Sequence, residues 1–121
     1  MKNTLILFVI SVFLFAGCYY DNEADLYQFY QNQCDTTSIS YSADIEPIMV
    51  TQCVSCHSGT NPDGNVGLEN HSEVQFSAEN GSLYGCVTNT NDFNIMPPAG
   101  ALFQCDIDKI DAWIKAGMPN N

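Results

Sequence analysis

Basic residues are scarce in this chain of 121 residues, which holds three lysines and arginines against fourteen aspartates and glutamates. All fourteen acidic residues follow Cys18, where only Lys109 and Lys115 oppose them, so this part of the chain carries a net charge of −12. The balance argues against nucleic acid as a partner, because its phosphates would repel the chain. It also argues against charge-driven docking on anionic lipid. An acidic surface can steer basic partners, but a solvated surface that keeps the protein soluble is its commoner meaning.

The chain also lacks a hydrophobic run long enough to span a bilayer, which takes about 20 residues. Its longest apolar run covers residues 5–16, follows a basic start and predicts a signal peptide over residues 1–17. The segment ends in FAGC, which resembles the lipobox of bacterial lipoproteins. This resemblance implies cleavage before Cys18 and acylation of that cysteine. The alternative is an ordinary signal peptide cut nearby, with Cys18 left as a spare thiol, and both interpretations export the protein.

Lipidation of Cys18 would anchor the protein to a membrane, since two or three acyl chains hold stably where one does not. Tyr19 follows Cys18, so the aspartate that retains some lipoproteins in the inner membrane is absent from that position. We therefore expect attachment to the bacterial outer membrane, facing the periplasm. Asp21 and Glu23 resemble surface-export signals of some bacterial groups, which makes exposure outside the cell the alternative.

Strand-like alternation and internal repeats are missing too, and two helical patterns stand out instead. The first runs through SADIEPIMVTQC, where Asp44 is a plausible N-cap and Pro47 falls in the first turn. Helical spacing places Ile45, Ile48 and Met49 on one face.

The second helical pattern, CDIDKIDAWIKAGMP, is the clearest in the chain. Asp106 can cap it, Asp111 and Lys115 can pair four residues apart, and Gly117 and Pro119 end it. Four residues form its apolar stripe: Ile107, Ile110, Trp113 and Ile114.

The remaining sequence is mostly loop. Residues 58–67 and the stretch NTNDFNIMPPAG have loop composition, while SEVQF and GSLYGCV can each supply one or two helical turns. We expect residues 18–40 to form a lipidated cysteine and a tether. Residues 41–121 are expected to form the folded domain. We expect an all-α domain with extensive loops and a thin protein core, which a haem would fill.

The motif CVSCH, residues 53–57, carries the chemistry. Two cysteines at this spacing match the two vinyl groups of a haem, to which their thiols add. His57 follows immediately, so its imidazole reaches the iron on the same face of the ring. The motif therefore predicts one covalent haem c held by Cys53, Cys56 and His57.

Three other readings of the motif are weaker. A thioredoxin-like redox pair needs an α/β context, which is absent. A structural zinc site needs two further ligands, and neither His71 nor Cys86 has the spacing of a ligand pair. A plain disulfide between Cys53 and Cys56 would explain neither His57 nor the thin core.

Met96, in NIMPPAG, is the predicted second axial ligand of the iron. Its two following prolines stiffen the loop and push Met96 towards extended geometry, so the loop can hold a thioether without a helix. Met49 is predicted to pack in the core. His71 is the runner-up ligand, although a lone histidine in a polar run is more often solvated.

Four stretches together resemble small class I cytochromes c: IEPIMVTQCVSCHSG, LYGCV, MPPAG and IDAWIKAGMPNN. The most similar are short mono-haem domains on exported lipoproteins, akin to the planctomycete-type cytochrome domain. The resemblance covers residues 34–121. It implies a class I cytochrome c-like fold of short helices around the haem, with thioethers at Cys53 and Cys56 and axial ligands at His57 and Met96.

Six cysteines in a small exported chain indicate an oxidising compartment. With Cys18 lipidated and two cysteines in the motif, three remain, which predicts one bridge and one free thiol. The resemblance implies a disulfide between Cys34 and Cys105. Cys86 stands where similar sequences usually have serine, which leaves it open whether Cys86 is free, modified or a partner of one of the other two.

A haem whose axial positions are both filled by protein has no site for peroxide or oxygen, so we expect single-electron transfer between exported redox partners. The expected protein is an electron carrier and not an enzyme. The alternative is a haem-based sensor or a peroxidase-like enzyme with a displaceable distal ligand. A di-haem peroxidase would need a second CxxCH, and the chain has one.

Overall fold

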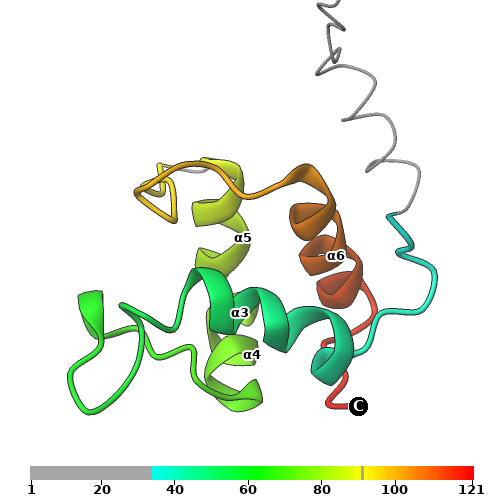
Figure 1. The fold of residues 1–121 in the computed structure, drawn as a ribbon, viewed down its shortest axis with the longest axis horizontal. Helices are drawn as coiled ribbons and strands as arrows, with labels where there is room; N and C mark the ends of the chain where they lie inside the picture. The colour runs from blue at the N-terminus through cyan, green and yellow to red at the C-terminus, as the bar shows by residue number, and fades with distance from the viewer. Residues whose placement is uncertain (1–33, 91) are drawn as a thin grey trace, which may run out of the picture.

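The computed structural model describes residues 34–90 and 92–121. Helices make up 49% of this part, which contains no strand, and the prediction of an all-α fold is confirmed. The elements, in chain order, are η1 (Tyr41–Ile45), α3 (Glu46–Gln52), η2 (Asp63–Asn65), α4 (His71–Glu79), α5 (Ser82–Thr88) and α6 (Gln104–Lys115) (Figure 1). The last helix, α6, packs against η1 and α5, and α5 packs against α4.

The first helix begins earlier than the sequence predicts. One π-helical turn, η1, leads directly into α3, and its N-cap is Ser40, whose hydroxyl accepts from the backbone N–H of Ala43. Asp44 is therefore not the N-cap. It lies in the first turn, where its carboxylate accepts from the N–H of Ser40 at 3.0 Å and completes a reciprocal pair of capping bonds. Pro47 stands at the start of α3, as expected.

Of the two middle helices, α5 has the two turns that the sequence allows, and α4, with nine residues, is longer than the one or two turns predicted for it. The side chain of Asn70 caps α4 by accepting from the N–H of Glu73 at 3.2 Å. This pairing of Asn with Glu three residues later is a start signal that the sequence contains. A glycine at positive φ, Gly81, then separates α4 from α5.

The last helix has the predicted apolar stripe and ion pair. Ile110 and Trp113 are buried and Ile107 and Ile114 half-buried, while Lys115 pairs with Asp111. The helix ends in a Schellman motif, because Gly117 N–H donates to Ile114 and Met118 N–H to Trp113, both at 3.0 Å.

The expected cap of α6 is wrong. Asp106 lies inside the first turn, and Phe103 occupies the N-cap position without a side-chain bond. Because Asp106 is half-buried there, desolvation raises the pKa of its carboxyl above the ordinary value.

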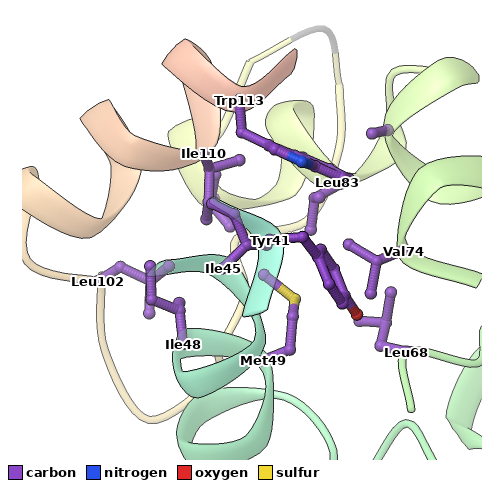
Figure 2. Close-up of a cluster of buried hydrophobic side chains, with 12 residues drawn as sticks. Tyr41, Ile45, Ile48, Met49, Leu68, Val74, Leu83, Leu102, Ile110 and Trp113 are labelled. Atoms are coloured by element: carbon purple, nitrogen blue, oxygen red, sulfur yellow. The ribbon is translucent and has the colours of Figure 1, made fainter. Parts of the chain in front are cut away.

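A small core joins the first and last helices (Figure 2). Its five most deeply buried side chains come from η1, α3, α4 and α6: Ile45, Met49, Val74, Ile110 and Trp113. The predicted core role of Met49 is confirmed, since only 1% of it is exposed. The indole Nε1–H of Trp113 donates to the carbonyl of Pro119 at 3.0 Å, which satisfies the one polar atom of this large side chain.

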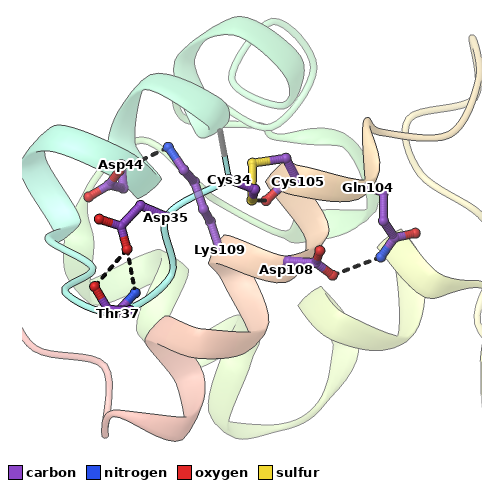
Figure 3. The surroundings of a disulfide bond; sticks show 8 residues. All are labelled: Cys34, Asp35, Thr37, Asp44, Gln104, Cys105, Asp108 and Lys109. Carbon is purple, nitrogen blue, oxygen red and sulfur yellow. Dashed lines mark hydrogen bonds and ion pairs between the residues drawn. A yellow bond between two sulfur atoms is a disulfide. The ribbon is translucent and has the colours of Figure 1, made fainter. Parts of the chain in front are cut away.

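A disulfide links Cys34 to Cys105, with 5.5 Å between the Cα atoms (Figure 3), and this is the pair that the resemblance implies. Lys109 lies nearby on α6 and donates to Asp44 at 3.0 Å. These two connections tie the start of the described chain and the first helix to α6.

Several predictions fall on residues outside the described part. They are the signal peptide (1–17), the lipidated Cys18 and the larger share of the tether (18–40). Along residues 34–90 and 92–121, no helix has the length and apolar content needed to cross a membrane.

Candidate haem-attachment site

The CVSCH motif forms a tight turn directly at the end of α3. The N–H of Cys53 still donates to the carbonyl of Met49 at 2.9 Å, as in a further helical step. The chain then reverses, and the carbonyl of Cys53 accepts from Cys56 at 3.1 Å and from His57 at 3.0 Å. Both cysteines and the histidine of the motif thus sit on one hydrogen-bonded turn that is anchored to α3 through the buried Met49.

The loop after the motif folds back onto this turn. The carbonyl of Cys56 accepts from the N–H of Asp63 at 3.0 Å, and the carbonyl of His57 accepts from Leu68 at 2.9 Å. Because Leu68 is buried in the core, the loop is held at its far end as well.

The ring of His57 is oriented by the backbone of the same loop. Its Nδ1 lies 3.0 Å from the carbonyl oxygen of Val66. A carbonyl can only accept, so Nδ1 carries the proton, and the lone pair of Nε2 is left to bind a metal. No hydrogen bond to Nε2 of His57 occurs among the described residues. Sequence reasoning missed Val66, because it acts through a backbone oxygen that any residue would supply.

The two thiols of the motif are free, since the disulfide joins Cys34 and Cys105 instead. Cys53 is half-buried against the core and Cys56 is exposed. Burial raises the pKa of the Cys53 thiol to about 11. Reactive thiols of redox pairs have lowered pKa values, so the environment of Cys53 is the opposite of a thioredoxin-like site.

A zinc site finds no support in the structure. Over residues 34–90 and 92–121, no group of three or more His, Cys, Asp and Glu side chains is placed to hold a metal ion. The two candidate zinc ligands named from the sequence, His71 and Cys86, are therefore not gathered around the motif. Cys86 is a free, half-buried thiol, and burial raises its pKa.

His71 is half-buried and has a structural role. Its Nε2 donates to the carbonyl of Met118 at 3.0 Å. Its ring meets the rings of Tyr41 and Trp113 edge-on, with centroids 4.7 and 5.8 Å apart. The nitrogen that would bind iron is thus engaged with the C-terminal segment.

Met96 is placed by α5. It is half-buried, and its N–H donates to the carbonyl of Cys86 at 3.0 Å, which ties the MPPAG loop to the last turn of that helix. The hydrogen bonds of the described residues join Met96 to α5 and not to the CVSCH turn.

Two hollows in the surface lie away from the motif. One, of about 240 Å³, is bordered by Val66, Gly67, Glu73, Phe76 and Ser77 among others, on α4 and the loop before it. The other, of about 460 Å³, lies beside the disulfide, along Asp108, Asp111 and Lys115. The first shares Val66 with the environment of His57 but includes neither motif thiol.

The donor set fits a covalently attached haem better than a bare metal. Two free thiols and one imidazole with a protonated Nδ1 match the needs of two vinyl groups and one iron. A bare ion of zinc would require two more ligands at this turn. No family model matches the chain, and no curated protein and no solved structure matches it either.

Proposed function

We propose that the chain is a mono-haem c-type cytochrome with a class I cytochrome c-like fold, which passes single electrons between exported redox partners. The observation that carries the proposal is the CVSCH turn, where both thiols are free and Val66 holds His57 with Nε2 available. The all-α architecture, the small core and the Cys34–Cys105 disulfide are consistent with the family that the sequence resembles.

Attachment of the haem needs no oxidant. Cys53 and Cys56 would each hold the haem through a thioether, formed by addition of the S–H bond across a vinyl double bond, with sulfur bonded to one carbon and the proton to its neighbour. The raised pKa of Cys53 keeps its thiol protonated, which disfavours a competing disulfide with Cys56, because the thiolate is the form that attacks in disulfide exchange.

The residues of the chain then set the redox behaviour. When bound, the haem supplies one-electron chemistry between ferric and ferrous iron. His57 donates through Nε2, and its bond to Val66 fixes the ring and increases its donor strength. The thioether of Met96 favours the ferrous state and raises the reduction potential above that of a bis-histidine pair. His57 and Met96 would together hold the iron and leave it no site for peroxide or oxygen, so the haem would serve electron transfer.

The anchor belongs to the same proposal. Cys18 carries the lipid, and residues 19–40 connect it to the domain, which faces the periplasm from the outer membrane. The partners are redox proteins, and the net charge of −12 after Cys18 favours basic docking surfaces on them.

Optical spectra of the full chain, produced with c-type maturation machinery, test the proposal. We expect a haem that survives acid–acetone extraction and, in the oxidised protein, the weak band of iron bound to methionine sulfur. Met96→Leu should lose this band. Met49→Leu and Met118→Leu are matched controls that should keep it, because volume-conserving swaps disturb packing little.

Two results would contradict the proposal. Haem that is fully extracted by acid–acetone would show that the motif is not an attachment site. A covalent haem without the band in the unmodified protein, which binds carbon monoxide when reduced, would favour a sensor or a peroxidase-like enzyme.

A further inference from the structure

The segment that carries Met96 is bound to α5 at several points. Thr90 N–H donates to the carbonyl of Gly85 at 2.9 Å, and Phe93 N–H donates to Thr90 at 3.2 Å. Met96 N–H then donates to the carbonyl of Cys86 at 3.0 Å. The bond of Thr90 closes the C-terminal end of α5, and the bond of Met96 brings the later chain back to the same helix at Cys86, next to Gly85.

The ring of Phe93 lies directly on Gly85. A Cβ atom at position 85 would stand 2.1 Å from Cδ2 and 2.7 Å from Cε2 of Phe93. Carbon atoms in favourable contact are about 3.5–4.0 Å apart, so any side chain at this position would displace the ring. Gly85 is buried inside α5 and has no left-handed backbone, so conformational freedom does not explain the glycine. Glycine is disfavoured inside helices, and the close approach of Phe93 supplies the reason for it here.

We infer that Gly85 and Phe93 form a positioning contact that sets where the Met96 thioether stands, an inference that rests on the proposed haem-binding function. Phe93 is three residues before Met96, and the two residues meet the neighbouring positions 85 and 86 of one helix. A ring pushed off Gly85 therefore shifts the segment that the bond between Met96 and Cys86 holds. Neither residue touches the iron; both act through Met96.

Three variants of the full, haem-loaded chain test this inference. Gly85→Ala adds the methyl group that meets Phe93, and Phe93→Ala removes the ring. Gly85→Ala combined with Phe93→Leu replaces the rigid ring by a smaller and more flexible side chain, which can turn away from the added methyl group. Tyr84→Ala is the matched control, since it removes a ring of similar size from the adjacent, partly exposed position of α5.

The measurements separate positioning from folding. Acid–acetone extraction reports the covalent haem, far-ultraviolet circular dichroism reports the helices, and the methionine–iron band with the midpoint potential reports Met96. We expect Gly85→Ala and Phe93→Ala to keep the haem and the helices but to lose the band, lower the potential and gain carbon monoxide binding. The double variant should regain the band, and Tyr84→Ala should never lose it.

Two outcomes would overturn the inference, and they differ from each other. If the unmodified chain lacks a covalent haem or the band, the proposed function fails and the inference fails with it. If the unmodified chain shows both and Gly85→Ala and Phe93→Ala also keep the band and the potential, the inference alone is wrong. Should Gly85→Ala fail to fold, Phe93→Ala decides the matter, since it introduces no clash.

Discussion

The imidazole of His57 donates through Nδ1 to the carbonyl of Val66 at a distance of 3.0 Å. The bond spans a loop of eight residues whose turn depends on positive φ angles at Gly64 and Asn65, 65° and 56°. The orientation of the proposed proximal ligand is thus set by the shape of a loop, and not by another side chain.

Straining this loop should therefore change the redox potential. Gly64→Val forces a β-branched residue into the left-handed region, which costs about 1–2 kcal/mol of stability. The displaced carbonyl of Val66 should weaken the bond to His57, make the imidazole a poorer donor and raise the midpoint potential. Asp63→Ala, an exposed neighbour, is the control and should leave the potential unchanged. An unchanged potential in Gly64→Val, with stability lowered, would show that the loop does not tune the ligand.

The sequence predicts the helices that have a clear apolar face. The stripe of α6 and the face of Ile45, Ile48 and Met49 pack against the core as expected, because core packing follows hydrophobic spacing directly. α4 was underestimated because its buried positions include Ser77 and Ala78, so the hydrophobic pattern is weak. The cap of the first helix was misplaced because Ser40 and Asp44 can both accept, and only the three-dimensional turn decides between them. The cap of α6 was misplaced because the helix begins after the apolar Phe103, without any side-chain cap.

The site divides in a similar way. The thiols and His57 are visible because chemistry requires those side chains at fixed spacing. Val66 acts through its backbone carbonyl, which every residue type has, so the sequence gives no signal for it. Gly85 acts through the absence of a side chain, which leaves space for the ring of Phe93. The role of His71 depends on Tyr41, Trp113 and Met118, which lie far from it in the chain.

Removal of the Cys34–Cys105 disulfide should lower the free energy of unfolding by roughly 2–4 kcal/mol. The bridge closes a loop across 71 positions of sequence, so most of its effect lies in restricting the unfolded chain. Urea unfolding of Cys34→Ala/Cys105→Ala against the unmodified chain measures the difference. Cys86→Ser is the control, because its thiol is free. A loss of equal size in Cys86→Ser would contradict the assignment.

Two aspartates near Lys109 should have opposite effects on the pH dependence of stability. The Ser40 N–H bond, followed by Lys109, lowers the pKa of Asp44 below its ordinary value of 3.8. Its contribution is therefore present above that value and lost as pH falls through the lower, folded-state pKa. Burial raises the pKa of Asp106 above 3.8, so ionisation of this residue reduces stability as pH rises through its folded-state pKa.

Urea unfolding between about pH 3 and pH 7 checks both signs. Asp44→Asn should cost about 1 kcal/mol near neutral pH, from the cap and the ion pair, and progressively less in acid. Asp106→Asn should stabilise the protein near neutral pH and have little effect at the acid end. Parallel profiles for the two variants would rule out this explanation.

His71→Ala should destabilise the protein without changing the haem spectrum. The substitution removes the bond from Nε2 to Met118 and the edge contacts with Tyr41 and Trp113, for a loss of about 1–2 kcal/mol in urea unfolding. His71→Phe, which retains an aromatic ring but no donor, should recover part of that loss. The spectrum matters most here, because Met96→Leu and His71→Ala make opposite predictions for it. If His71→Ala abolished a low-spin spectrum that Met96→Leu preserved, His71 would be the distal ligand, and the C-terminal segment would have to release it when the haem is attached.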